Sequence, residues 1–465
     1  MTKDRMRIAS LGVLIVLFVA CGSGGASKGG PDSGVLGGGG VTGTLTVAYD
    51  GNGNTGGVAP VDAHTYQPGV GVVVLGNTGD MVKTGYSFAG WNTLADGSGT
   101  TYMPAQTLEL GAASVILYAQ WTAISVVGYA YVANQYDGSV SQYMIAEGGI
   151  LVPMTPPTVV AGDTPEAITV DPSGRYVYVA NARPTPAGKI SQYAIGATGA
   201  LSPMATPSAS AGTYPVSIVV DPSGKYAYVA NNQSGDVSEF ALGADGALAL
   251  VGTVKSEQGY PNAPASVVVD PSSKYVYVAN ADGKSVSQYT IGADGSLSPM
   301  TPTSVPTNGK NGNAYHMTVH PSGAYLYVAG YFDNVVFQYA IGANGALSPL
   351  TPASVATDTY PGAIAVDPSG KFAYVVNANA AAAISLYTVG ADGVLTPMSP
   401  ATLAATTYFA NVAIDSSGKY LYATSGYPGS TVLQYTIGAT GTLTPMAQPS
   451  VPSGSGPNAI VIVKK

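Results

Sequence analysis

One seven-residue phrase returns through the chain from residue 128 onward, first as GYAYVAN and later as RYVYVAN, KYAYVAN, KYVYVAN, AYLYVAG, KFAYVVN and KYLYATS. Its second aromatic residue falls at positions 131, 178, 228, 277, 327, 374 and 422, so successive copies lie 47 to 50 residues apart. A strand-like phrase with a period near 50 is typical of a β-propeller, because one such unit cannot bury its apolar surface without neighbours.

Each repeat predicts four strands, as in EAITV, RYVYVAN, KISQYAI and ALSPMA, with a DPSG turn between the first two. Proline fixes φ at the second turn position, and glycine relieves strain where the chain re-enters a strand. The first unit lacks its first strand, whereas an unmatched strand, PNAIVIV, follows the seventh unit. We therefore predict a seven-bladed propeller over residues 126–465, closed by a C-terminal strand that completes the first blade and removes free edges.

The composition favours an all-β protein with few groups for chemistry. Charged residues make up 9% of the chain, against about 25% in typical soluble domains, and Val, Thr and Tyr favour strands. The formal charge of −8 without a basic patch argues against a nucleic-acid partner. The single cysteine, Cys21, excludes a disulfide, a cysteine zinc cluster and a c-type haem site. We expect no cofactor and no metal.

The N-terminal sequence predicts that the protein is exported. MTKDRMR leads into the apolar run IASLGVLIVLFVA, which is too short for a transmembrane helix and fits a signal peptide at 1–20. Phe18-Val19-Ala20-Cys21 resembles a bacterial lipobox, which implies that Cys21 is acylated and anchors the protein in a membrane. Gly22 favours the outer membrane or cell surface, and the Gly/Ser-rich residues 21–40 form a tether. The alternative is an ordinary cleaved signal peptide.

Residues 41–122 contain sequence motifs that differ from those of the repeats. The phrases YDGNGNTGG, GYSFAGWNT and LYAQWT resemble the Listeria–Bacteroides (internalin B-type) repeat, a small β-rich module of bacterial surface proteins. The resemblance implies a spacer or an adhesive unit. GNGNTG also has the spacing of a dinucleotide-binding fingerprint, but no helical pattern follows it. The same stretch lacks the glycine and glutamate of a calcium loop, so we expect a hairpin turn.

The phrases VDPSGKYAYVAN and GADGALSPM of the repeats resemble the bacterial lactonase-type seven-bladed propellers over residues 126–463. The family includes lactonases and members without a known reaction. In the lactonases an Arg-His pair before the turn and an acidic residue after the YV strand are implicated in ring opening. This chain keeps His316 but has Tyr315 in place of the arginine and Gly330-Tyr331 in place of the Asn-acidic pair.

His316 stands where equivalent strands have Ala167, Ser217, Ser266, Ala363 and Asn411. A general base without the polarising cation loses a large electrostatic contribution. Our first hypothesis is therefore a non-catalytic binding or adhesion protein that recognises a glycan, a peptide or an envelope partner. The alternative is a lactonase-like hydrolase that uses His316 with an unidentified partner. A purely structural envelope component is a third possibility.

The DPSG and GADG turns recur on one face of the ring, whereas the loops after YVAN and those entering each first strand vary on the other. We predict that a ligand binds to the variable face. Rings with a polar edge suit sugars or peptides, although each ring could simply cap its own blade. Glu166 and Asp333 are further charges outside the repeated turns. The candidate ligand-binding residues are Tyr136, Arg183, Tyr214, Tyr260, Lys310, Tyr315, His316, Tyr331, Tyr360, Tyr408 and Tyr427.

Overall fold

The computed structural model describes residues 44–465 except residues 84, 184–186, 257–262, 310–313, 380–382, 406 and 427. The predicted signal peptide, the lipidation site Cys21 and the tether lie outside the described residues. So do three of the candidate ligand-binding residues, Tyr260, Lys310 and Tyr427. Within the described part of the chain, no helix is long and apolar enough to cross a membrane.

The small module is built around a buried tryptophan. Trp91 is fully buried, and its indole N–H donates to the carbonyl of Leu75 (2.9 Å). Trp121 donates to the carbonyl of Gly51 (2.9 Å), which fixes the GNGN stretch as a turn rather than as a helix start. The sheets have the orders β1-β6-β3-β4 and β2-β5, with β1 (Val47–Asp50), β2 (Gly71–Val73), β3 (Tyr86–Asn92), β4 (Thr101–Tyr102), β5 (Thr107–Glu109) and β6 (Val115–Ala123).

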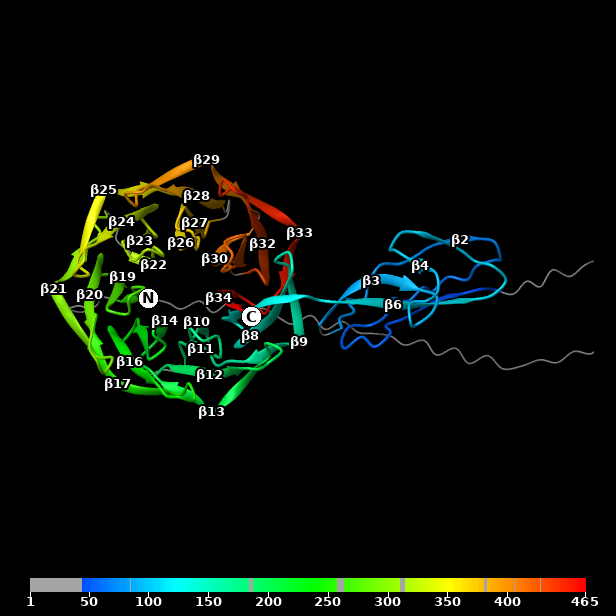
Figure 1. The fold of residues 1–465 in the computed structure, drawn as a ribbon, viewed down its shortest axis with the longest axis horizontal. Coiled ribbons are helices and arrows are strands. Elements are labelled where there is room, and N and C mark those ends of the chain that lie inside the picture. Colours follow the sequence, from blue (N-terminus) through cyan, green and yellow to red (C-terminus); the bar gives the residue numbers. More distant parts are fainter. Residues whose placement is uncertain are drawn as a thin grey trace, which may run out of the picture.

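The described part of the second unit contains seven four-stranded antiparallel sheets arranged round an axis (Figure 1). The strand nearest the axis is, in blade order, β34 (Pro457–Lys464), β10 (Pro165–Val170), β14 (Pro215–Val220), β18 (Pro264–Val269), β22 (Ala314–Val319), β26 (Pro361–Val366) and β30 (Phe409–Ile414). The second strand, which carries the YVAN phrase, is β7 (Val126–Asn134), β11 (Tyr176–Asn181), β15 (Tyr226–Asn231), β19 (Tyr275–Asn280), β23 (Tyr325–Gly330), β27 (Phe372–Asn377) and β31 (Tyr420–Ser425).

The outermost strand of each blade is its longest and most exposed, whereas the third strand is largely buried. The third strand is β8 (Ser139–Ala146), β12 (Lys189–Ile195), β16 (Asp236–Leu242), β20 (Ser285–Ile291), β24 (Val335–Ile341), β28 (Ala383–Val389) and β32 (Thr431–Ile437). The outermost strand is β9 (Leu151–Val160), β13 (Leu201–Ser210), β17 (Leu248–Lys255), β21 (Leu297–Pro306), β25 (Leu347–Ala356), β29 (Leu395–Ala404) and β33 (Leu443–Pro452).

The predicted closure of the ring is confirmed. The C-terminal β34 pairs antiparallel with β7, with Ile460 opposite Val132 and Val461 opposite Tyr131. The first blade thus takes its inner strand from the C-terminus and its other three from the beginning of the propeller. The all-β, seven-bladed fold class predicted from the repeats is correct.

The repeated tyrosine joins each blade to the next. The hydroxyl of Tyr131 donates to the carbonyl of Gly199 in the following blade (2.6 Å), and Tyr422 of the last blade donates to Gly149 of the first (2.6 Å). Gly199 has φ +85°, and a Cβ there would lie 2.2 Å from the ring of Tyr129. The same bond joins Tyr178 to Gly246, Tyr228 to Gly295, Tyr277 to Gly345, Tyr327 to Gly393 and Tyr374 to Gly441.

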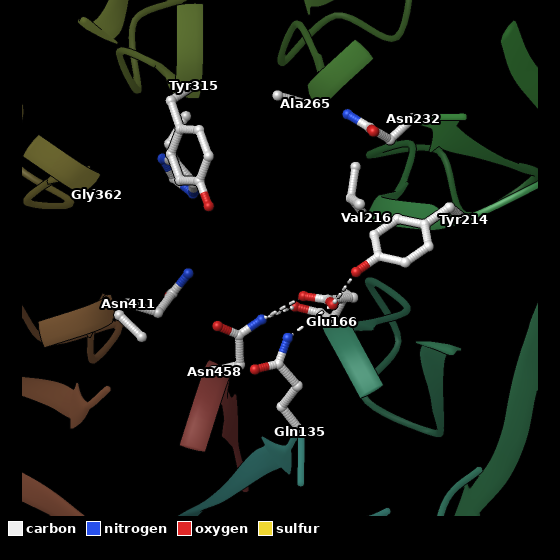
Figure 2. Close-up of a pocket in the computed structure, with 12 residues that line it drawn as sticks. Gln135, Glu166, Tyr214, Val216, Asn232, Ala265, Tyr315, Gly362, Asn411 and Asn458 are labelled. Carbon is white, nitrogen blue, oxygen red and sulfur yellow. Dashed lines mark hydrogen bonds between the residues drawn. The ribbon is translucent and has the colours of Figure 1, made fainter. Parts of the chain in front are cut away.

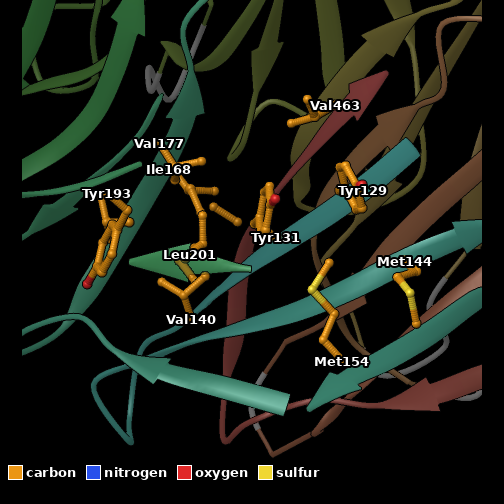
Figure 3. Packing of buried hydrophobic residues seen from close by; sticks show 13 residues of the cluster. Tyr129, Tyr131, Val140, Met144, Met154, Ile168, Val177, Tyr193, Leu201 and Val463 are labelled. Atoms are coloured by element: carbon orange, nitrogen blue, oxygen red, sulfur yellow. The ribbon is translucent and has the colours of Figure 1, made fainter. Parts of the chain in front are cut away.

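Apolar side chains fill the wedge between neighbouring blades. Between the first and second blades, Tyr131 and Val140 pack with Ile168, Val177 and Leu201 (Figure 3). Equivalent clusters lie between other adjacent blades. The YVAN strand therefore has apolar residues at alternate and intervening positions because both of its faces are buried.

A buried glutamine on the third strand also links blades, and in one blade a glutamate replaces it. Gln142 accepts a hydrogen bond from the backbone N–H of Leu201 (2.7 Å) and donates to the carbonyl of Pro156 in its own blade (3.2 Å). Glu239 likewise accepts from Leu297 (3.0 Å), but an ionised carboxylate has no proton to donate. Burial raises the pKa of Glu239, and the hydrogen bond from Leu297 opposes this only in part.

We expect Glu239→Gln to stabilise the protein by about 1–2 kcal/mol at pH 7, because the amide keeps the oxygen that accepts from Leu297 and removes the cost of burying a charge. A carboxyl whose pKa is raised on folding favours the folded state at low pH and loses this contribution as pH rises through its folded pKa. The gain should therefore shrink towards pH 4 in urea titrations. Gln288→Glu is the matched control and should lose stability at pH 7. Equal effects of Glu239→Gln at both pH values would contradict this account.

Candidate functional site at the mouth of the central channel

A cavity of about 330 Å³ opens on the propeller axis, on the face that carries the variable loops (Figure 2). All seven blades contribute to its wall. The lining residues are Gln135, Glu166, Tyr214, Val216, Asn232, Ala265, Tyr315, His316, Gly362, Ala410, Asn411 and Asn458. Among them, Glu166 is the one with a formal negative charge, and none is a lysine or an arginine.

Seven of the lining residues occupy the same place, the second residue of each inner strand. At this residue the pairing with the YVAN strand shifts register: Pro165 pairs with Asn181, but Ala167 pairs with Ala180. The residue between them is a β-bulge, left out of the ladder, and a bulge re-aims its side chain. The seven bulge residues are Glu166, Val216, Ala265, Tyr315, Gly362, Ala410 and Asn458.

Glu166 is held by donors from three neighbouring elements. Gln135, just after β7, and Asn458, on β34, each donate to its carboxylate at 2.8 Å. The hydroxyl of Tyr214, just before β14, donates at 3.5 Å. Burial raises the pKa of Glu166, and these three hydrogen bonds oppose the rise in part. The result is a fixed carboxylate in the cavity wall with a stronger affinity for protons than a free glutamate has.

His316 follows the bulge residue Tyr315 on β22 and combines a structural contact with a place in the cavity. Its Nδ1 accepts a hydrogen bond from the backbone N–H of Ile364 in the next blade (3.4 Å). Ser217 and Ser266 make the same bridge from their blades. Burial lowers the pKa of His316 to about 4. The imidazole is therefore neutral at pH 7 and carries its proton on Nε2, where it acts as a donor.

Tyr315 directs its hydroxyl into the cavity (Figure 2). Burial raises the pKa of this phenol, and the negative charge of Glu166 raises it further, so the hydroxyl keeps its proton at neutral pH. The ring also contacts Tyr331, with ring centroids 5.1 Å apart. Tyr331 contacts Tyr360 at 5.2 Å. Tyr315 therefore belongs both to the cavity and to an aromatic cluster beside it.

Three other residues predicted from the sequence lie outside this cavity. Tyr136 and Arg183 line a second cavity of about 580 Å³, which shares Gln135 and Tyr214 with the first. Tyr408, just before β30, is 40% exposed and lines neither cavity. Among the described residues, no group of three or more His, Cys, Asp or Glu is placed to hold a metal ion.

Sequence reasoning missed four polar residues of the cavity and undervalued a fifth. Glu166 was noted only as a charge outside the turns. A signal was present: aligning the second residue of the seven inner strands gives Glu, Val, Ala, Tyr, Gly, Ala and Asn, a column as variable as the one containing His316. The missed residues are Gln135, Asn232, Asn411 and Asn458.

Comparison with protein families agrees with both units. Residues 130–462 match the family described as lactonase, 7-bladed beta-propeller. This chain belongs to the seven-bladed lactonase propeller family. Residues 46–120 match the Listeria–Bacteroides repeat domain, so this lactonase-family propeller follows such a repeat module, as the sequence phrases predicted.

Solved structures share the propeller fold. The periplasmic gluconolactonase PpgL of Pseudomonas aeruginosa superposes with a TM-score of 0.63 at 20% identity, covering 72% of this chain and 99% of its own. A Bacteroides fragilis protein provisionally assigned as a 6-phosphogluconolactonase gives a TM-score of 0.62 at 20% identity, covering 73% and 99%. A Lactobacillus plantarum protein gives 0.61 at 18% identity, covering 73% and 100%. At these identities the likeness shows the fold.

Two curated relatives come from Evansella cellulosilytica and are provisionally named membrane proteins, one of them Gly-rich. One is 38% identical over 89 residues, which is 18% of this chain and 10% of the relative. The other is 41% identical over 78 residues, 17% of this chain and 11% of the relative. This lactonase-family chain thus spans about a tenth of the length of the curated relatives that it matches.

Proposed function

We propose that the protein hydrolyses lactones in the axial cavity, with Glu166 as the general base and with His316 and Tyr315 as hydrogen-bond donors to the carbonyl. One observation carries this proposal: a single cavity is lined by the carboxylate of Glu166, the phenol of Tyr315 and the imidazole of His316, and burial shifts the pKa of each. Catalytic sites characteristically contain titratable groups with such perturbed pKa values. Family membership favours this hypothesis over the non-catalytic binding role that we first expected.

Glu166 is suited to activate water. Its raised pKa brings it nearer to neutral pH, where a general base is most effective. Gln135, Tyr214 and Asn458 occupy part of its hydrogen-bonding capacity and fix its orientation, and an ionised carboxylate has about four acceptor positions. A free position remains to accept a proton from water as the water oxygen attacks the lactone carbonyl carbon.

His316 and Tyr315 are suited to stabilise the charge that develops on the carbonyl oxygen. The Nε2–H and the phenol are neutral donors, and preorganised donors are most effective where water is excluded. Tyr315 occupies the place of the arginine in the family motif, so a neutral phenol replaces a cation. Collapse of the tetrahedral intermediate breaks the ring C–O bond, and the proton held by Glu166 passes to the leaving alkoxide. The hydroxy acid product then releases its carboxyl proton to water.

Proton release from a panel of γ- and δ-lactones, followed in a pH-stat with the full chain, tests the proposal. We expect His316→Ala to lower kcat/KM by about 100-fold, as loss of one such donor does elsewhere. His320→Asp is the matched control, because His320 follows the far end of the strand that carries His316 and bonds Ser322 and Gly370 in the turn there. It should keep its activity. Equal rates for His316→Ala and the unaltered protein would overturn the proposal, as would no turnover above buffer.

We also propose that acylated Cys21 anchors this hydrolase at the cell envelope. The basic and apolar stretch before Cys21 and the membrane-protein names of the Evansella relatives support it. Metabolic labelling with a fatty acid should mark the protein in the membrane fraction. Cys21→Ala should lose the label, and a labelled Cys21→Ala protein would contradict acylation at this residue.

A further inference from the structure

An aromatic ledge adjoins the axial cavity. It consists of Tyr315 on β22, Tyr331 and Phe332 after β23, and Tyr360 just before β26. Tyr331 lies at the centre of the ledge, with its ring centroid 5.1 Å from Tyr315, 5.2 Å from Phe332 and 5.2 Å from Tyr360. The four rings therefore form one cluster of ring contacts across two neighbouring blades, with Tyr331 and Tyr360 tilted by 35° and Phe332 edge-on to both.

The ledge is accessible to solvent. Tyr315 is 46% exposed, Phe332 50% and Tyr360 43%, and grouped apolar exposure marks a binding site more often than a scattered exposed residue does. Tyr360 also has φ +59°, at the place where the first blade has Gly456 with φ +63°. Thr164 and Tyr214 have φ +58° and +60° at the same place in the second and third blades, so this left-handed conformation belongs to the turn before the inner strand.

The cavity beside the ledge suits a neutral, hydroxyl-rich ligand. Among the described residues that line it there is an acidic group, Glu166, and no lysine or arginine, so a phosphorylated ligand would find no facing cation. The amides of Asn232 and Asn411 offer donors and acceptors, and Asn458, whose amide N–H groups are bonded to Glu166, offers its amide oxygen. These groups match sugar hydroxyls.

The ledge suits the C–H face of a pyranose ring. Such a face packs flat on aromatic rings and gains many small dispersion contacts, while phenol edges bond the equatorial hydroxyls. Tyr315 is continuous with both regions, because its hydroxyl lines the cavity and its ring contacts Tyr331. A ligand that leaves the cavity along Tyr315 therefore reaches the ledge.

We propose that the substrate is a neutral sugar lactone extended by at least one further pyranose, with the lactone in the cavity and the pyranose on the ledge. The identity of the lactone end rests on the proposed hydrolase function. The stacking of the pyranose rests on the ledge alone.

Kinetics on three lactones test the extended substrate: glucono-1,5-lactone, cellobiono-1,5-lactone and 6-phosphogluconolactone. We expect the full chain to prefer the disaccharide lactone to the monosaccharide lactone by about tenfold or more in kcat/KM, and to use the phosphorylated lactone least. Tyr331→Ala and Phe332→Ala should each remove most of this preference, mainly through KM. Tyr408→Ala, an exposed rim tyrosine outside the ring contacts of the ledge, should keep the preference. Equal kcat/KM for the two neutral lactones would overturn the proposal.

A binding experiment distinguishes failure of the proposed pyranose site on the ledge from failure of the proposed hydrolase function. Calorimetric titration with cellobiose, which has no lactone, should show weak binding that Phe332→Ala reduces and Tyr408→Ala does not. If no lactone is hydrolysed but this binding is present and lost in Phe332→Ala, the ledge stands and the hydrolase fails. If lactones are hydrolysed but cellobiose does not bind at millimolar concentration, the extended substrate is wrong.

Discussion

A chain that ends at Gly456 should lose the folded propeller. Residues 457–465 include β34, whose backbone pairs with β7 from Pro457 opposite Asn134 to Lys464 opposite Gly128. Ile460 and Val463 are buried in the wedges on the two sides of the first blade. Losing these two side chains lowers the free energy of unfolding by roughly 1.5–3 kcal/mol each, and the loss of the strand pairing lowers it further. A whole domain is stable by only about 5–15 kcal/mol.

Circular dichroism during heating and size-exclusion chromatography measure this effect. The truncated chain should show no cooperative transition and should elute as aggregates, since β7 becomes a free edge. A chain that ends at Val463 is the control, because it keeps all but the last of these pairs, and it should melt within about 5 °C of the full chain. A cooperative, monomeric 1–456 chain would show that the six remaining complete blades are sufficient.

Glu166→Gln should lower lactone hydrolysis by about 1,000-fold, the scale of losing a general base. The amide keeps the size of the side chain but cannot accept a proton from water. Folding should survive, because burial raises the pKa of Glu166 and the ionised form is the costly one in the folded state. An unchanged melting temperature beside the lost activity would assign the loss to chemistry.

The pH dependence of kcat/KM gives an independent readout for Glu166. The base must be deprotonated, so activity should fall with decreasing pH through the raised pKa of Glu166, above the ordinary glutamate value. His316 has a pKa of about 4, so it stays neutral over the pH range in which Glu166 is expected to titrate. The residual activity of Glu166→Gln should not show this fall in kcat/KM at low pH. Glu239→Gln, which alters a buried glutamate outside the cavity, should keep the kcat/KM of the unaltered protein and its fall at low pH. An unchanged pH profile in Glu166→Gln would exclude Glu166 as the base.

The fold could be predicted because its rules repeat locally. The period, the DPSG turns and the unmatched C-terminal strand all lie within single stretches of sequence, and each was interpreted correctly. The hydrogen bonds of the YVAN tyrosines could not be predicted, because each partner lies in the next blade, 68 residues away for Tyr131 and Gly199. A core role was evident for Tyr131, whereas its role as a link between blades was not.

The site was less predictable because it depends on closure of the ring. His316 was found as an exception within the repeats. Glu166 was undervalued because one of its donors, Asn458, is 292 residues away and reaches it only when β34 completes the first blade. The bulges that direct Glu166 and Tyr315 towards the axis are backbone irregularities without a separate sequence phrase.

The seven bulge residues have a consequence for how such a protein evolves. Each stands outside the backbone ladder, so a codon change there alters the chemistry at the axis while the pairing that builds the blade is untouched. The tyrosines between blades, in contrast, are under selection for assembly. Descendants of one ancestral ring can therefore diverge in specificity by substitutions at these seven positions, of which Glu166 and Asn458 are hydrogen-bonded and should change together. Comparison of the seven positions should separate related propellers by ligand better than overall identity does.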